Sequence, residues 1–312
     1  MEYSIIVPVY NEEKVINEAF KRIKSVMDTV SAEYEMIFID DGSKDTTKSI
    51  LKNLTKENKK AKAIFLSRNF GHQAAISAGL DYCSGQAVVI IDADMQDPPE
   101  IIPEMIKKWK EGYDVVYGKR ISRKGENSLK KITAKLFYIL LNMLTKENIP
   151  EDVGDFKLID RKVANALKKI HEKNRYLRGI ISWLGFKQGE MEYERKERYA
   201  GETKYTTSKM IKLSMDAITS FSYAPLKIAT YIGFFISGIS FLYLIVVIYQ
   251  KVFTNTTIKG WASITAVNLF FNGIVLVILG IFGEYIGRIY DEANNRPIYI
   301  VDDTSGIAEK NQ

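Results

Sequence analysis

The chain has 312 residues, of which 46% are hydrophobic and 26% are charged, and its formal net charge is +6. This composition excludes an intrinsically disordered protein, and the single Cys83 excludes an internal disulfide. The positive charge is modest and is not interleaved with aromatic residues as in RNA-binding proteins, so we expect no nucleic-acid partner.

Up to about residue 205, short apolar runs alternate with helix-like stretches. The predicted strands, with their following turns, cover 3–13, 35–47, 61–67, 87–92 and 114–118, and the predicted helices cover 13–30, 73–82 and 101–111. Short β-branched strands separated by helices are typical of a mostly parallel sheet that is covered on both faces. We therefore predict an α/β fold for this part of the chain.

Two later segments, 228–249 and 260–283, contain no Asp, Glu, Lys or Arg. Each is long enough to cross a bilayer core of about 30 Å as a helix. A pair of buried core helices is the alternative, although core helices seldom run this far without a charge. The polar connector 250–259 makes the two segments a hairpin, and the excess of basic residues on its outer flanks favours a cytoplasmic catalytic part. Those residues are Lys204, Lys209, Lys212, Lys227 and Arg288, against Lys251 and Lys259 in the connector.

Polar side chains follow four successive predicted strands. They are Asn11 and Glu12, Asp40 and Asp41, Arg68 and Asn69, and Asp92 and Asp94. In a parallel sheet, ligands collect at the carboxyl ends of the strands. Helix capping is the alternative explanation, and we accept it for Ser43 and Asp45. The four strand ends together predict a ligand site at this edge of the sheet.

The acidic residues after the fourth strand suit a metal ion. No glycine-rich turn follows the first strand, so the phosphates of a nucleotide must be neutralised in another way. Asp92, Asp94 and Gln96 alternate along what we expect to be an extended chain, which places their side chains on one side. Two carboxylates and an amide oxygen suit Mg²⁺ or Mn²⁺. Such an ion would bridge a nucleotide diphosphate and stabilise the charge that develops on it as a leaving group.

Six motifs occur in order and are followed by the two apolar segments: VPVYNEE, IDDGSKDTT, NFGHQAAISAGLDYCSG, DADMQDPPE, VGDFKLIDRKV and ERYAGETKYTTSKM. The match that they define spans about residues 3–290. This set resembles the polyprenyl-phosphate glycosyltransferases of glycosyltransferase family 2, relatives of dolichol-phosphate mannose synthase and of bacterial bactoprenol glucosyltransferases. The resemblance implies a GT-A fold, a nucleotide-sugar donor, a divalent metal and inverting transfer of one sugar to a polyprenyl phosphate.

The resemblance also implies roles for single residues. It assigns Pro8, Tyr10, Glu12 and Asp41 to the nucleotide base and ribose, and Asp92, Asp94 and Gln96 to the metal and the donor diphosphate. It places Arg68 and Gln73 on the sugar side, and Arg198 and Lys204 on a phosphate. Asp155 in the GDF motif takes the position of a candidate catalytic carboxylate beside the acceptor.

Chemistry narrows the role of Asp155. A phosphate monoester is already largely anionic near pH 7, because its second pKa is about 6. A general base, which contributes about 10²–10⁴-fold for hydroxyl acceptors, is therefore hardly needed. We expect Asp155 to orient the acceptor or a nearby cation rather than to abstract a proton. His72 and His171 are too dispersed to complete a metal site, and we expect structural or local hydrogen-bonding roles for both.

We expect four regions along the chain. They are a GT-A domain at 1–205, an interfacial amphipathic helix at 206–225, a transmembrane hairpin at 226–290 and a cytoplasmic tail at 291–312. The protein would then be integral to the cytoplasmic membrane of a bacterium, with the catalytic domain and both termini cytoplasmic.

The family members with this layout favour UDP-glucose or UDP-N-acetylglucosamine as donor and undecaprenyl phosphate as acceptor, while the sequence does not identify the sugar. One alternative is a processive polysaccharide synthase, but Gly179 stands where the synthase motif has Trp after its arginine, here Arg178. Another is a non-catalytic scaffold that binds nucleotide sugars. Loss of the acidic residues would have supported it, but Asp92, Asp94 and Gln96 are all present. A homo-oligomer is also open, because 297–303 could add a strand to a neighbouring chain.

Overall fold

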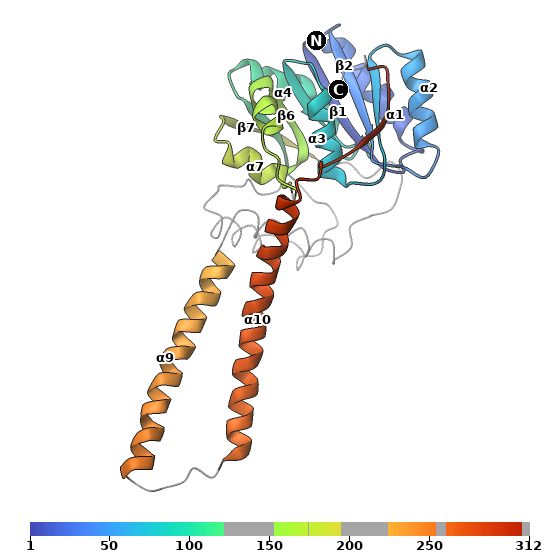
Figure 1. Cartoon of the computed structure of the whole chain (residues 1–312). Coiled ribbons are helices and arrows are strands. Elements are labelled where there is room, and N and C mark those ends of the chain that lie inside the picture. The colour runs from blue at the N-terminus through green and yellow to red at the C-terminus, as the bar shows by residue number, and fades with distance from the viewer. Residues whose placement is uncertain (122–152, 174, 195–223, 254–259, 308–312) are drawn as a thin grey trace. The chain divides into compact units, whose positions relative to one another are not determined.

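The protein is described by a computed structural model that covers residues 1–121, 153–173, 175–194, 224–253 and 260–307. The chain divides into two compact units, one of Met1–Ala217 with Pro297–Gln312 and the other of Ile218–Arg296. The first unit contains a β-sheet with its helices, and the second contains two long helices (Figure 1). The predicted interfacial helix lies almost wholly outside the described residues.

Within the described residues, one eight-stranded sheet with the order β7-β5-β6-β4-β1-β2-β3-β8 forms the centre of the first unit. Its strands are β1 (Tyr3–Val9), β2 (Tyr34–Asp40), β3 (Ala61–Leu66), β4 (Ala87–Ile90), β5 (Val115–Arg120), β6 (Val153–Asp160), β7 (Gln188–Tyr193) and β8 (Val301–Ser305). β1 to β4 pair in parallel, β5 pairs in parallel with β7, and β6 and β8 run antiparallel to their neighbours. The predicted mostly parallel α/β sheet is confirmed.

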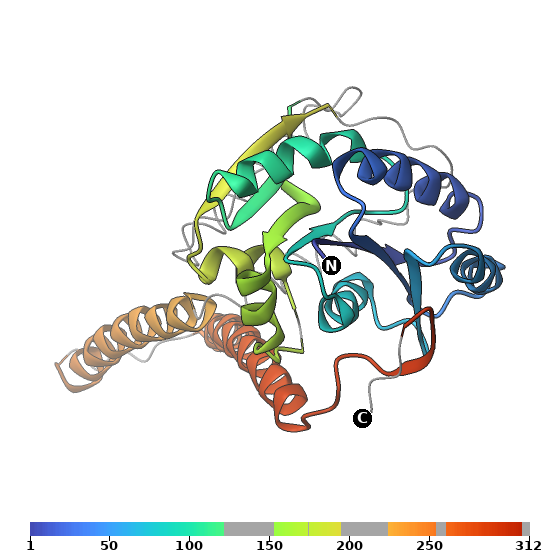
Figure 2. The same ribbon diagram turned by 90° about the horizontal axis from the view of Figure 1, so that it is seen from above.

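Helices cover both faces of this sheet, and the residues of its central strands β1 and β2 are therefore buried on both sides (Figure 2). One face packs on α1 (Ile16–Val30), α2 (Thr47–Glu57), η1 (Pro99–Ile101) and α4 (Ile102–Lys110). The other carries α3 (His72–Tyr82), α6 (Arg161–Lys168) and α7 (Leu177–Trp183). Gly79 lets α3 approach the strands closely, since a Cβ there would lie 2.5 Å from Ile6 Cγ2. This close packing fixes the start of α3 over the ends of the strands.

The C-terminal strand pairs within its own chain. β8 lies antiparallel to β3, with Ala63 opposite Ser305, and Ser67 N–H donates to Ile300 O at 2.9 Å. Residues 301–305 therefore have a partner strand within their own chain, and the possibility that 297–303 adds a strand to a neighbouring chain stays a prediction. The physical reason for this pairing is that the exposed edge of β3 presents unpaired backbone groups, and the chain's own tail satisfies them. Two ion pairs hold the strand there, Lys48–Asp302 at 2.8 Å and Lys52–Asp303 at 2.6 Å.

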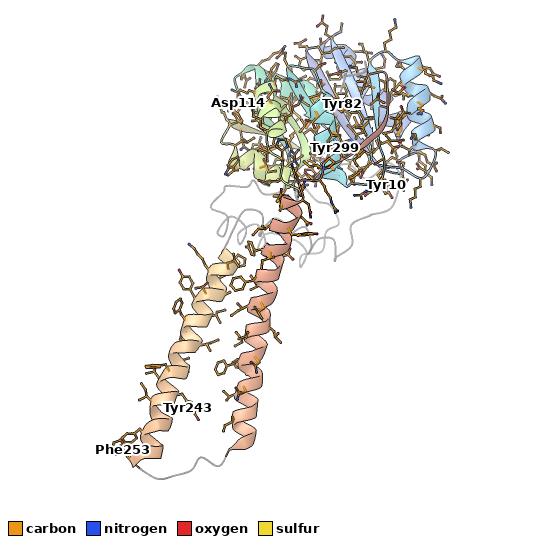
Figure 3. All side chains as sticks on the ribbon, viewed as in Figure 1. Tyr10, Tyr82, Asp114, Tyr243, Phe253 and Tyr299 are labelled. Carbon is orange, nitrogen blue, oxygen red and sulfur yellow. The ribbon has the colours of Figure 1, made fainter. Side chains whose placement is uncertain are left out.

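The second unit consists of α9 (Ala224–Phe253) and α10 (Trp261–Ala293), which contact each other. Within them, Pro225–Tyr243 and Phe270–Ala293 are long and apolar enough to cross a membrane by length and composition. Large apolar side chains point away from the helices, Tyr243 and Phe253 among them, and the exposed fraction of Phe253 is 73% (Figure 3). These helices are not buried as the alternative of core helices requires.

Candidate active site

The pairing of β4 with β6 brings Asp92 and Asp155 together. Ile90 lies opposite Lys157 in this antiparallel register, so two further residues along β4 place Asp92 opposite Asp155. Because β6 runs antiparallel, its first residues lie at the edge where the parallel strands end. This edge includes the switch in strand order between β1 and β4, which is where ligands bind in such sheets.

His72, the first residue of α3, lies between the two carboxylates. Its Nε2 is 3.4 Å from Asp92 Oδ1 and 3.4 Å from Asp155 Oδ2. Burial alone would lower the pKa of His72, but the charges of Asp92 and Asp155 outweigh it and raise the pKa to about 9. A protonated imidazole here keeps two like-charged carboxylates close to each other.

Asp155 is held by two hydrogen bonds from one arginine. Arg178 of α7 donates from Nε to Oδ1 at 3.0 Å and from Nη2 to Oδ2 at 3.1 Å. Burial would raise the pKa of Asp155, but Arg178 and His72 hold it well below its usual range. A carboxylate that stays ionised and is bound on both oxygens is a poor proton acceptor, which supports an orienting role.

The backbone around Asp94 differs from the predicted extended chain. β4 ends at Ile90, the chain turns at 93–95, and Met95 has a φ of 55°. Gln96 N–H donates to Asp94 Oδ1 at 3.2 Å and so stabilises this turn. The expectation of an extended chain is therefore wrong, because local hydrogen bonding of the aspartate ends the strand. Asp92, Asp94 and Gln96 are nevertheless all half-exposed, while their neighbours Ala93, Met95 and Asp97 are buried.

The donor set of this turn fits a hard divalent cation. Oδ1 of Asp92 is buried and accepts no hydrogen bond from the residues that the structure describes. Burial raises the pKa of Asp92 to about 6, with smaller contributions from nearby carboxylates. No group of three His, Cys, Asp or Glu side chains in the described ranges is arranged to hold a metal. Mg²⁺ needs no such group, because it commonly takes one or two carboxylates and completes its shell with substrate phosphates and water.

Asp41 follows β2 and organises the loop that leads into α3. It is buried and accepts hydrogen bonds from Phe70 N–H at 2.7 Å and Gly71 N–H at 2.9 Å. Burial raises the pKa of Asp41. Gly42 permits this contact, since its φ is 69° and a Cβ would lie 2.5 Å from the backbone carbon of Arg68. Asp41 thereby helps to position His72, and its assignment to a nucleotide stays a prediction.

The remaining candidate residues lie at the same edge or outside the described ranges. Pro8 is buried in β1, and Tyr10 and Glu12 follow it, with Glu12 N–H bound to Thr47 Oγ1 at 3.0 Å. Arg68 is exposed and stacks on Phe70, while Gln73 Oε1 accepts from Leu177 N–H at 3.3 Å. The predicted phosphate ligands Arg198 and Lys204 lie outside the described residues.

Sequence reasoning missed three charged residues of this site: His72, Arg178 and Lys157. His72 was expected to have a structural or local hydrogen-bonding role and was not assigned to the site, and its Nε2 lies 3.4 Å from a carboxylate oxygen of each of Asp92 and Asp155. A signal for the other two was present, because a charged residue inside an otherwise apolar strand or helix is uncommon unless it has a function. Lys157 in VGDFKLID and Arg178 in LRGIISW fit that description.

Comparisons with known proteins agree with this architecture. The sequence profile of Glycosyl transferase family 2 matches residues 4–168. The "Uncharacterized glycosyltransferase YkcC" of Bacillus subtilis is 57% identical over 99% of this chain and 96% of its own length. The "SfII prophage-derived bactoprenol glucosyl transferase" of Shigella flexneri is 42% identical over 96% of this chain and 97% of its own.

A solved structure shares the fold. The glucosyl-3-phosphoglycerate synthase of Mycobacterium tuberculosis, crystallised with Mn²⁺, UDP and phosphoglyceric acid, superposes with a TM-score of 0.51 at 18% identity. The match covers 70% of this chain and 76% of that one. The first unit is therefore a GT-A fold, and the chain belongs to glycosyl transferase family 2 as a glycosyltransferase.

Proposed function

We propose that the protein transfers one sugar from a nucleotide sugar to undecaprenyl phosphate with inversion, and that UDP-glucose or UDP-N-acetylglucosamine is the donor. The observation that carries this proposal is the pair of carboxylates at the sheet edge. Asp92 leaves a buried oxygen without a hydrogen-bond partner among the described residues, while Asp155 opposite it is fully bound by arginine. Asp92 is therefore suited to bind a cation that carries the donor diphosphate, and Asp155 is suited to hold a fixed position beside the acceptor.

The residues divide the chemistry between donor and acceptor. Asp92, Asp94 and Gln96 would hold Mg²⁺ or Mn²⁺, which supplies positive charge to the departing diphosphate. A phosphate oxygen of the acceptor forms the new bond to the anomeric carbon while the bond from that carbon to the diphosphate breaks. The acceptor needs no deprotonation, so Asp155 keeps its charge and position throughout.

The relatives support the acceptor class and the membrane location. The Shigella flexneri protein, similar over nearly its whole length, is named a bactoprenol glucosyl transferase. That name favours single transfer to a lipid over processive polymer synthesis. In this proposal 1–205 is catalytic, 206–225 lies at the membrane surface, 226–290 spans the cytoplasmic membrane and 291–312 returns to the cytoplasm. The two exposed apolar helices support this layout.

The test is a donor screen with purified full-length protein in detergent. Undecaprenyl phosphate and Mn²⁺ or Mg²⁺ are mixed with each radiolabelled nucleotide sugar, and the lipid fraction is analysed. We expect one sugar per lipid with a UDP-sugar, and no product when a chelator is present. Failure to label any lipid, or formation of a polymer, would contradict the proposal.

A further inference from the structure

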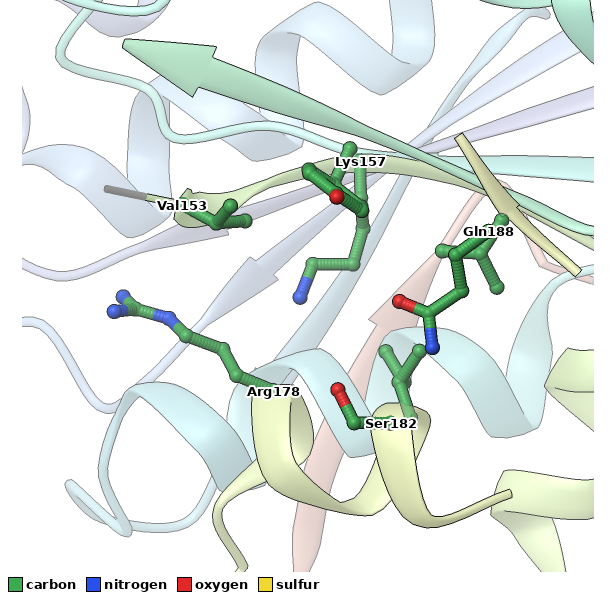
Figure 4. Close-up of a pocket in the computed structure, with 8 residues that line it drawn as sticks. Val153, Lys157, Arg178, Ser182 and Gln188 are labelled. Carbon is green, nitrogen blue, oxygen red and sulfur yellow. The ribbon is translucent and has the colours of Figure 1, made fainter. Parts of the chain in front are cut away.

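A small pocket adjoins the active site on the side of α7. It lies between β5, β6, α7 and the start of β7, and its volume is about 20 Å³ (Figure 4). Ligand pockets for drug-sized molecules start at about 300 Å³, so this one has no room for a nucleotide sugar and could receive only a small polar group at its mouth. Arg178 lines it and also binds Asp155, so the pocket directly adjoins the predicted acceptor side.

Lys157 points into this pocket from the middle of β6 (Figure 4). Its exposed fraction is 4%, and it makes no hydrogen bond or ion pair within the described part of the chain. Buried lysines are almost always paired, because an ammonium that loses its hydration without gaining a hydrogen bond or an ion pair destabilises the folded state. Burial lowers the pKa of Lys157 to about 8, so the group is still mostly charged at pH 7.

The other described lining residues indicate the charge of the missing partner. Arg178 adds a second cation, whose charge Asp155 already partly balances, and Ser182 Oγ is buried without a hydrogen-bond partner among the described residues. Gln188 contributes an amide, and none of the described lining residues is acidic. Two cations, a hydroxyl and an amide complement an anion that has several oxygen atoms.

We propose that this pocket binds the phosphoryl group of the lipid acceptor, with Lys157 as its principal cation and Ser182 as a hydrogen-bond donor. This inference rests on the proposed function and adds a binding site to it. The donor diphosphate is a less suitable occupant, because the described lining residues come from β5, β6, α7 and β7, whereas the candidate donor residues follow β1 to β4. Lys157 stays protonated during transfer and exchanges no proton with the substrate.

The test compares acceptor use with donor binding in full-length variants. Lys157→Met should lower kcat/KM for undecaprenyl phosphate by about 10–100-fold, as expected for the loss of a charge-assisted hydrogen bond. Ser182→Ala should lower it by about 3–10-fold, and Lys157→Arg should retain part of the activity. The affinity for UDP should change by less than about twofold in each variant.

Lys162→Met is the matched control, because Lys162 is an exposed lysine of α6 that pairs with Asp114 at 2.7 Å. It should leave both quantities unchanged. Unchanged acceptor use in Lys157→Met would overturn the inference. Equal losses of UDP affinity and acceptor use, with a lower melting temperature, would also overturn it, since Lys157 would then act as a structural charge.

A binding assay separates failure of this inference from failure of the proposed function. Farnesyl phosphate, a soluble prenyl phosphate, should raise the melting temperature of the wild type, whereas farnesol should not. Inorganic phosphate serves as the arm without a lipid chain, and a smaller protection by it would show that the phosphoryl group alone is recognised. If the wild type transfers no sugar but Lys157→Met still abolishes the farnesyl phosphate effect, the pocket stands and the proposed reaction falls. Equal protection of wild type and Lys157→Met would overturn the pocket.

Discussion

Two groups of charged residues lie at opposite ends of the same sheet, and they differ in how completely each charged group is hydrogen-bonded. At the amino end of β2, the fully buried Glu35 accepts hydrogen bonds from Ser4 Oγ at 2.5 Å and Ser84 N–H at 2.7 Å, and Lys62 Nζ lies 2.5 Å from its other oxygen. At the carboxyl ends of the strands, Asp92 Oδ1 and the Lys157 ammonium have no hydrogen-bond partner among the described residues.

This difference separates charges that stabilise the fold from charges to which we assign a ligand-binding role. A buried charge with all its hydrogen bonds made contributes to a defined structure, while one that lacks partners raises the free energy of the folded protein. Both groups consist of ordinary acidic and basic side chains in neighbouring strands. The completeness of their hydrogen bonding, rather than their residue types, therefore distinguishes the end of the sheet at which we propose that ligands bind.

The largest expected effect is at the incompletely paired end. Asp94→Asn removes the negative charge of one of the proposed metal ligands, and we expect kcat/KM to fall by about 10²–10³-fold. The free energy of unfolding should hardly change, because Asp94 is half-exposed. Glu100→Gln is the control, since Glu100 is an exposed acid of the same segment that pairs with Arg22 at 2.6 Å. Full turnover by Asp94→Asn at limiting Mn²⁺ would show that the carboxyl ends of the strands, like their amino ends, are not where the reaction takes place.

The fully paired end should give the opposite result. Glu35→Gln leaves Lys62 without its partner, and we expect the free energy of unfolding to fall by about 2–4 kcal/mol. Activity per folded molecule should stay at the wild-type level. Urea denaturation of full-length protein in one detergent measures the first quantity, and kcat/KM measures the second. A selective loss of activity with unchanged stability would show that Glu35 also belongs to a functional site.

The pH dependence of this stability difference has a definite sign. Burial would raise the pKa of Glu35, but Lys62 and the two serines outweigh it and lower the pKa below the ordinary 4.5. A lowered pKa in the folded state means that the stabilisation is complete above about 4.5 and is lost as the pH falls through the folded-state value. The gap between wild type and Glu35→Gln should therefore close in acid, below about pH 4.5.

Much of this arrangement could be predicted from local sequence patterns. The strands that end at Val9, Asp40 and Leu66 are short apolar runs stopped by polar residues, and the acidic cluster after β4 is visible in the letters themselves. Parallel strands end at one edge, so the fold class alone brings the candidate residues that follow these strands to one edge of the sheet.

Long-range pairing decided what the sequence could not show. Asp155 meets Asp92 because β6 is antiparallel to β4, and Asp155 lies far along the chain from its partner. The hydrogen bond from Gln96 N–H to Asp94 Oδ1 stabilises the turn at 93–95 and competes with strand continuation. The C-terminal strand could pair with any free edge, and only the folded chain shows that β3 of the same molecule takes it.

A smaller effect on stability is expected at Lys157. Lys157→Met removes an ammonium that burial destabilises, so we expect the free energy of unfolding to rise by about 1–3 kcal/mol at pH 7. The pKa of Lys157 is lowered from 10.5 to about 8, so between these values the unfolded chain binds more protons than the folded one. Wild-type stability therefore rises with pH in that range, and the advantage of the variant should shrink. An advantage that is absent at pH 7, or constant up to pH 10.5, would mean that Lys157 has a partner.

The smallest expected effect on stability is at Asp302, in an exposed ion pair that serves as a reference for the buried Glu35. Asp302 pairs with Lys48 at the β8 edge, and its side chain is 53% exposed. Exposed ion pairs contribute little to stability, because water stabilises the separated charges nearly as well as the pair stabilises itself. Asp302→Asn should therefore lower the free energy of unfolding by at most about 0.5 kcal/mol. Activity should not change, and raised salt should abolish the difference in urea midpoints. If this exposed pair cost as much as Glu35→Gln, burial and completeness of hydrogen bonding would no longer explain why the two ends of the sheet behave differently.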